Sequence, residues 1–316
     1  MTSKDIYNLV VRLGMESDLR GIDRVKKYLA KAREKFSQLP ADLQAEYDQE
    51  KLTNPYSDTR LLVDNNRGEI KKIMVGIDIG GAELMLADKI GDIDLVISHH
   101  PDGAALAGLH EVMDLQARVL ADYGVPINVA ESILFPYINE IKRVISPLNH
   151  DRTPDFARAL KLDYLCTHTV ADNLSAKFVT DLIKKHETGL ETVGDVIKLL
   201  KTIPEYKEAM KIKAGPCIFT GQADASCGKV VATEFTGGTN GAKEIYEKMS
   251  QAGIGTIISM HMTEEYRKEA KKHHLNVIIA GHIASDSLGM NLFLDEVENF
   301  GVQIVPIAGL TRIKRK

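Results

Sequence analysis

The fold of this protein is decided by Asp94-Leu95-Val96-Ile97-Ser98-His99-His100-Pro101. A short β-branched run between turn residues predicts a core strand of a parallel sheet. Ligands of such sheets gather at the carboxyl ends of the strands, where His99 and His100 would lie. Adjacent residues on a continuing strand point to opposite faces, so both imidazoles serve one site only if the strand ends here. Pro101 favours that ending, because proline removes a donor from the ladder. The alternatives are that each histidine binds a different ion, or that both lie on the surface at a loop mouth.

Composition indicates a soluble globular protein. The chain has 316 residues, of which 44% are hydrophobic and 27% charged, enough for one large domain or two ordinary ones. The net charge of −4 gives no general attraction to nucleic acid, which we therefore disfavour as a partner. No apolar stretch approaches the ~18 residues of a membrane span, and the start lacks the apolar region of a secretory signal. Three cysteines without a Cys-x-x-Cys pair suit a reducing compartment, so we expect a cytoplasmic protein away from membranes.

The pattern of elements along the chain predicts an α/β protein. Residues 1–55 have helical periodicity and read as an accessory helical arm. From Lys71 onward, strands alternate with helices, which predicts largely parallel sheets flanked by helices. Residues 106–123 are expected to form one helix, residues 126–129 a short strand, and residues 133–145 another helix.

Two segments of the chain resemble each other. Residues 72–75 precede Gly80-Gly81, a helix and the strand that ends at His100, whereas residues 229–231 precede Gly237-Gly238, a helix and the strand that ends at His261. This repeat predicts two related α/β lobes that face one another, with sites at the seam; chance similarity of two generic βαβ units is the alternative. We expect a first lobe with extra helices at 56–215 and a second lobe at 216–316 that closes the cleft.

Three clusters that contain histidine follow predicted strands. Besides His99-His100, these are His168 with Asp172 and His282 with Asp286, each pair four residues apart. On a helix this spacing puts both side chains on one face, so each pair could grip an ion. Imidazole with carboxylate suits zinc, iron, manganese, nickel or cobalt. A single pair of this kind is more often structural, but three clusters together favour metal. The glycine run at 236–241 favours a tight turn over a phosphate site.

These motifs resemble the NGG-one-interacting factor three family, the GTP-cyclohydrolase-type-2-like dinuclear-metal proteins. The resemblance runs from about Tyr56 to Ile307, and its most specific element is Ile97-Ser98-His99-His100-Pro101. Residues 58–63, 75–78, 166–172 and 280–286 are similar to further family motifs.

The resemblance implies two divalent metal ions in a cleft between the lobes. Their ligands would be His99, His100, Asp172, His282 and Asp286. His168 would lie beside them as a further ligand, as a partner of a ligand, or as a catalytic group that moves a proton. Two departures stand out: Asp286 replaces the usual glutamate, and His261 stands where the family tends to have a glutamate, so we expect His261 only to line the site.

Such a pair of ions favours hydrolysis, because two divalent cations lower the pKa of a shared water and polarise the bond under attack. We therefore expect a dinuclear metal-dependent hydrolase, GTP cyclohydrolase-like, in which metal-bound hydroxide attacks a purine nucleotide or another small phosphorylated molecule. The alternative is a non-enzymatic metal-binding scaffold, metal chaperone or partner-binding regulator. The resemblance also implies a homohexamer built as a trimer of dimers.

Overall fold

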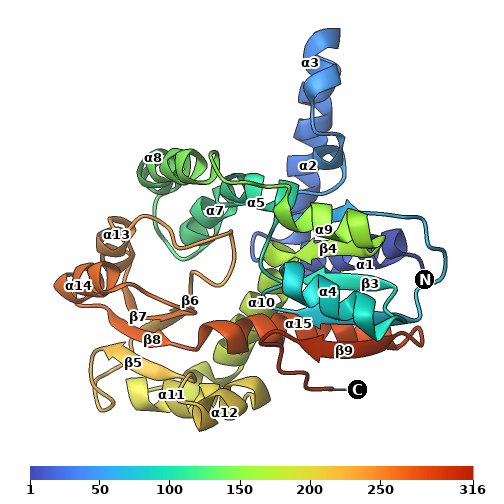
Figure 1. The fold of residues 1–316 in the computed structure, drawn as a ribbon. Helices are drawn as coiled ribbons and strands as arrows, with labels where there is room; N and C mark the ends of the chain where they lie inside the picture. Colours follow the sequence, from blue (N-terminus) through green and yellow to red (C-terminus); the bar gives the residue numbers. More distant parts are fainter. Residues whose placement is uncertain (316) are drawn as a thin grey trace.

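The computed structural model describes residues 1–315 and contains two mostly parallel sheets flanked by helices (Figure 1), which confirms the predicted fold class. The strands are β1 (Thr59–Val63), β2 (Lys72–Gly76), β3 (Leu95–Ser98), β4 (Asp163–Thr167), β5 (Cys217–Thr220), β6 (Lys229–Ala232), β7 (Ile254–Ser259), β8 (Asn276–Ile279) and β9 (Gln303–Ile307). The helices of the N-terminal half are α1 (Ser3–Glu16), α2 (Ile22–Ser37), α3 (Ala41–Glu46), η1 (Gln49–Leu52), α4 (Gly81–Ile90), α5 (Gly103–Ala107), α6 (Leu109–Val112), α7 (Asp114–Asp122), α8 (Ile127–Ile145) and α9 (Arg152–Leu160). The remaining helices are α10 (His168–His186), η2 (Glu187–Gly189), α11 (Val193–Leu200), α12 (Pro204–Lys211), α13 (Ile245–Gln251), α14 (Glu264–Lys272) and α15 (His282–Glu298).

The four strands of the second sheet are arranged in the same order as the first four strands of the first sheet. The first runs β1-β4-β3-β2-β9 and the second β5-β8-β7-β6. In each, the outer strand (β1 or β5) is antiparallel to its neighbour and the following strands are parallel. The repeated segments of the sequence thus correspond to β2-α4-β3 and β6-α13-β7. Strand β9, although last in the chain, pairs with β2 and extends the first sheet.

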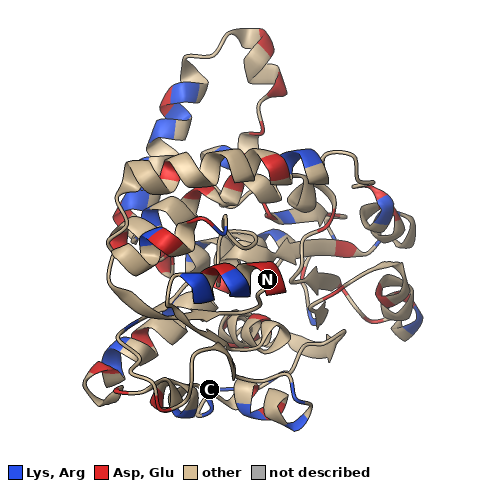
Figure 2. Cartoon of the chain, turned by 90° about the vertical axis from the view of Figure 1, so that its left-hand side faces the viewer, with Lys and Arg blue, Asp and Glu red and all other residues tan. Residues whose placement is uncertain are grey.

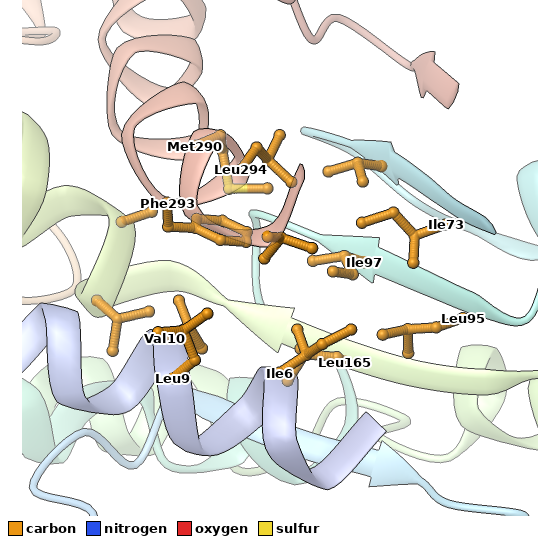
Figure 3. Close-up of a cluster of buried hydrophobic side chains, with 14 of the residues drawn as sticks. Ile6, Leu9, Val10, Ile73, Leu95, Ile97, Leu165, Met290, Phe293 and Leu294 are labelled. Atoms are coloured by element: carbon orange, nitrogen blue, oxygen red, sulfur yellow. The ribbon is translucent and has the colours of Figure 1, made fainter. Parts of the chain in front are cut away.

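The core of the first lobe lies where α1 and α15 pack on its sheet (Figure 3). Ile6 and Val10 of α1 contact the same buried cluster as Ile97 of β3, Leu165 of β4 and Phe293 of α15. All five side chains are fully buried. Burying such a side chain contributes about 1.5–3 kcal/mol each, so this cluster fixes the strands whose ends carry the histidines.

Helices α10 and α15 cross at very close range. A Cβ placed on Gly289 would come within 2.1 Å of the carbonyl oxygen of Ala171. Only glycine allows that approach, because real Cβ atoms do not come so near to a backbone oxygen. The crossing joins the helix that follows β4 of the first sheet to the helix that follows β8 of the second.

Two of the expected elements differ in the structure. Residues 126–129 were expected as a strand, but α8 begins at Ile127, with Pro126 as its N-cap. Proline suits this place because its fixed φ starts a helix and its missing N–H is not needed there. The helical spacing of Ala130 and Leu134, both buried, outweighs the β-branched residues before them. The single helix expected over 106–123 is instead interrupted, as α5, α6 and α7.

The N-terminal segment is helical, as predicted, but its helices have different places. Helix α1 is part of the core, whereas α2 and α3 project from the body. In Figure 2, Lys and Arg gather along the projecting α2 and mix with Asp and Glu elsewhere. Within residues 1–315, no helix combines the length and apolar character that a membrane crossing requires.

Candidate metal centre

The first pair of candidate ligands follows β3. The strand ends at Ser98, whose Oγ donates to the carbonyl oxygen of His100 at 2.7 Å. The N–H groups of His99 and His100 donate to the carbonyl oxygens of Gly76 and Ile77, both at 2.9 Å. These bonds hold the two residues beside the end of β2, and their ring centroids lie 5.2 Å apart. His99 is buried and His100 partly exposed.

The other candidate ligands lie in the first turns of two helices. His168 is the first residue of α10 and follows β4 directly, and Asp172 lies one turn later. In the second sheet, β8 is followed by Gly281 and then by α15, which begins at His282 and carries Asp286 one turn later. Gly281 has φ +109°, and a Cβ there would come within 2.4 Å of a backbone oxygen, so the turn requires glycine.

The six predicted residues come together at one place, although they come from both sheets. Three groups each place one ligand atom per residue within 4.8 Å of one another: His99, His100 and His168; His100, His282 and Asp286; and His99, Asp172 and Asp286.

The separations of nitrogen and oxygen atoms suit a shared cation better than direct hydrogen bonds. His99 Nε2 lies 3.4 Å from Asp172 Oδ1 and 3.4 Å from Asp286 Oδ1. Asp286 Oδ2 lies 3.5 Å from His100 Nε2 and 3.7 Å from His282 Nε2. Two ligands bound tetrahedrally to one zinc-sized ion would be about 3.4 Å apart. Asp286 therefore presents Oδ1 to one imidazole, that of His99, and Oδ2 to two, those of His100 and His282.

Several of these buried atoms have no hydrogen-bond partner among the described residues. They are both ring nitrogens of His99, Asp172 Oδ1 and both carboxylate oxygens of Asp286. Leaving buried polar atoms unpaired is costly, and native proteins rarely do so without a reason such as an ion. The donor set, imidazole with carboxylate, fits zinc and the late first-row divalent metals. The residues present therefore fit a metal centre.

Two further carboxylates orient imidazoles of the first lobe. Asp58, fully buried just before β1, lies 2.8 Å from His168 Nδ1 and also accepts from Thr169 Oγ1 at 2.6 Å. Asp78, after β2, lies 2.7 Å from His100 Nδ1. Carboxylates in this position fix the ring and leave Nε2 free for a metal. The sequence places both residues in segments that resemble family motifs, 58–63 and 75–78, but their role as partners of histidines was not predicted, because Asp58 is 110 positions from His168 and no local pattern links them.

The environment separates the pKa values of the two helix-start histidines. Burial lowers the pKa of His168, but the carboxylates of Asp172 and Asp58 outweigh burial and raise it to about 9. Burial lowers the pKa of His282 to about 4, against the opposing effect of Asp286. Burial also raises the pKa of Asp172 well above its usual range. Groups of one type with opposite shifts are characteristic of functional sites.

A cavity reaches this cluster from the second lobe. Its walls include His168, Asp172, His282 and Asp286 together with His261, Glu234 and part of the glycine run: Thr236, Gly238 and Thr239. No lysine or arginine is among the described residues that line it. His261 thus lines the cavity, as expected. Glu234 was missed, because nothing in its sequence context distinguishes it from a surface glutamate.

The glycine run is held over this cavity. Gly237 and Gly238 both have positive φ, and the amide of Gln116 donates to the carbonyl oxygens of Gly237 and Thr239 at 2.8 and 2.6 Å. The run therefore forms a tight loop tied to the first lobe.

Comparisons with known proteins agree with this architecture. No family model and no curated protein matches the sequence. Among solved structures, a NIF3 superfamily protein from Sphaerobacter thermophilus is 30% identical, with a TM-score of 0.75 over 80% of this chain and 92% of that one. Reduced HcgD from Methanocaldococcus jannaschii shares the fold at 13% identity, with a TM-score of 0.50 over 97% of both chains. Because the first relative is matched at this identity over nearly its whole length, the chain belongs to the NIF3 superfamily, the NGG-one-interacting factor three proteins that its motifs resemble.

Proposed function

We propose that this protein is a dinuclear metal-dependent hydrolase whose ligands are His99, His100, Asp172, His282 and Asp286. The observation that carries the proposal is the position of Asp286. Its Oδ1 faces His99 Nε2 and its Oδ2 faces His100 Nε2, at 3.4 and 3.5 Å, and neither oxygen has a hydrogen-bond partner among the described residues. A carboxylate whose two oxygens face different imidazoles would be placed to hold two ions at once.

When bound, two divalent ions supply Lewis-acid activation of a water and of the bond under attack. The side chains of the protein would exclude water, offset charge and move a proton. Burial of His99, Asp172 and Asp286 excludes bulk water and strengthens the electrostatic interactions inside the site. The two carboxylates offset part of the charge of the ions. His168, held by Asp58 at Nδ1, keeps Nε2 toward the cluster, 3.8 Å from Asp172 Oδ2, where it can carry a proton or serve as a further ligand.

The substrate belongs to the same proposal. The GTP cyclohydrolase-like activity that the resemblance implies makes a purine nucleotide the first compound to assay, with only its reacting end at the cavity beside the candidate ligands. The cytoplasmic location and the homohexamer remain predictions, and light scattering of the purified protein tests the latter.

The experiment is elemental analysis of protein purified without added metal, followed by hydrolysis assays on nucleotides and on chromogenic esters. We expect two equivalents of a divalent metal per chain, and turnover that is lost on chelation and in His99→Ala while the protein stays folded. Metal without turnover on any compound would overturn the enzyme and leave the scaffold or metal-chaperone alternative. Absence of bound metal, also after incubation with Zn²⁺ and Co²⁺, would overturn both.

A further inference from the structure

Glu234 occupies an unusual place at the end of β6. Its backbone has φ +57°, a conformation that L-residues rarely adopt. Its carboxylate lies within hydrogen-bond distance of donors from three elements: Tyr246 Oη at 2.9 Å, Ser259 Oγ at 3.0 Å and Asn240 Nδ2 at 3.2 Å. A carboxylate accepts about four hydrogen bonds, so Glu234 is anchored on three sides and ties α13, the end of β7 and the glycine run together.

The same two side chains reach the backbone of His261. Ser259 Oγ lies 2.8 Å and Asn240 Nδ2 3.3 Å from the carbonyl oxygen of His261. The amide of Asn240 has a proton for each of its two acceptors, whereas the single hydroxyl proton of Ser259 goes to either Glu234 or His261. The imidazole of His261 packs against that of His282, with ring centroids 4.6 Å apart. Glu234 is therefore linked, chiefly through Asn240, to the backbone of His261, the residue whose imidazole contacts that of a candidate ligand.

The internal repeat gives His261 a counterpart. In the first lobe, β3 ends at Ser98, whose Oγ bonds the carbonyl oxygen of His100; in the second, β7 ends at Ser259, whose Oγ bonds that of His261. The two histidines differ in one respect. His100 belongs to two of the three groups of possible ligand atoms, whereas His261 belongs to none among the described residues. His261 lines the cavity beside these ligand groups, where a molecule that enters the cavity can contact it.

We propose that His261 is the substrate-facing imidazole of the second lobe, which hydrogen-bonds the uncharged polar end of the substrate, such as a carbonyl or amide group, and that Glu234 is its positioning residue. The inference rests on the proposed metal centre. An uncharged group is favoured because the cavity beside His261 is lined by the neutral polar residues Thr236 and Thr239 and, among the described residues, by no lysine or arginine. A phosphate on the substrate would therefore lie outside this part of the site.

The positioning role is tested on the metal-free protein by NMR, through cross-relaxation between ring protons of His261 and His282. We expect the signal in the wild type and in the control Glu269→Ala, which removes a surface carboxylate that pairs with Lys272. In Glu234→Ala it should be lost, with the fold confirmed by the remaining spectrum. A retained signal in Glu234→Ala would refute the positioning role, as would its absence in the wild type.

The substrate-facing role is tested on the Co²⁺-loaded protein with acetamide, a small uncharged ligand with a carbonyl and an amide group. In His261→Phe we expect Co²⁺ affinity within twofold of the wild type and an acetamide affinity about tenfold lower, the loss of one good hydrogen bond. Unchanged acetamide affinity would refute the role, and so would a loss of Co²⁺ as large as in His100→Ala, which would make His261 a ligand. If the wild type itself binds no Co²⁺, the metal centre fails, and the substrate-facing role fails with it, while the NMR result still decides whether Glu234 holds His261.

Discussion

The two lobes present the same pair of residues at the start of a helix in very different surroundings. In the first lobe, His168 lies against Asp58 and Asp172, and its pKa is raised to about 9. In the second, His282 pairs with Asp286 alone among the described carboxylates, and burial lowers its pKa to about 4. The strand order and the His-x-x-x-Asp spacing are common to both. In the first lobe Asp172 and Asp58 together outweigh burial, whereas in the second lobe Asp286 alone does not, and no described carboxylate there takes the place of Asp58.

This contrast indicates a division of labour. The first lobe orients its imidazoles with carboxylates, Asp58 for His168 and Asp78 for His100, and such partners fix a ligand before the metal arrives. The second lobe instead holds His261 by backbone contacts around Glu234. We infer that the first lobe is the firmly held half of the metal centre, whereas the second lobe adds His261, which lines the cavity without belonging to a group of possible ligands.

The largest expected effect comes from substituting, one at a time, the first residue after each of the two matching strands β3 and β7. His99 after β3 corresponds to Met260 after β7, and both are buried. His99→Ala should weaken Zn²⁺ binding by more than the roughly 100-fold that loss of a residue behind a ligand can cost, because it removes the imidazole that lies between the carboxylates of Asp172 and Asp286. Met260→Leu keeps the volume and should leave Zn²⁺ affinity within a few-fold. Isothermal titration calorimetry measures the Zn²⁺ affinity of both variants. Equal losses of affinity would contradict the different roles assigned to the two lobes.

A second effect concerns Asp58. Replacing it by Asn keeps its shape but removes the charge that orients His168, so Zn²⁺ affinity should fall by about 10- to 100-fold. Asp78→Asn is the matched variant in the same lobe. Because the Asp78 side chain is 72% exposed, its loss should cost less. Competition with a coloured chelator gives the Zn²⁺ affinity of both variants. A larger loss of affinity in Asp78→Asn than in Asp58→Asn would contradict the greater importance assigned to Asp58.

The crossing of α10 and α15 predicts a loss of stability that does not depend on metal. Gly289→Ala forces a methyl group against the carbonyl oxygen of Ala171 and should lower the free energy of unfolding by about 1–3 kcal/mol. Gly189→Ala is the control, because nothing lies within 4 Å of its added Cβ. Urea denaturation of the metal-free variants compares them. Equal stabilities would mean that the helices are not in such close contact.

The smallest effect is a pH dependence that Glu234 adds to the second lobe. Burial raises the pKa of its carboxyl from 4.5 to about 7, against the opposing hydrogen bonds. The folded state then binds the proton more tightly than the unfolded state, so this contribution to stability is complete below pH 4.5 and is lost as the pH rises to about 7. Glu234→Gln should remove it. The difference in melting temperature between variant and wild type, followed from pH 4.5 to 8, should change in the variant's favour; a constant difference would contradict the shift.

The sequence allowed a good prediction of the parts that depend on local pattern. The strand at 95–98, the internal repeat and the three histidine clusters are local features, and the structure brings all six predicted residues together. The strand expected at 126–129 was wrong because β-branched residues also occur in a helix that tertiary packing favours. The role of Asp58, although it begins a segment that resembles a family motif, and that of Glu234 could not be predicted, because each acts through residues distant in the chain: Asp58 through His168, and Glu234 through Ser259, 25 positions away.

We propose that both lobes contribute to one centre with two ions, which Asp286 would bridge. Anomalous diffraction from crystals grown with Zn²⁺, recorded on both sides of the zinc absorption edge, tests it most directly. We predict two zinc peaks, one within bonding distance of each carboxylate oxygen of Asp286, with His99 beside one and His100 and His282 beside the other. Zinc bound elsewhere on the protein, or a single ion that leaves Asp286 without contact, would contradict the account.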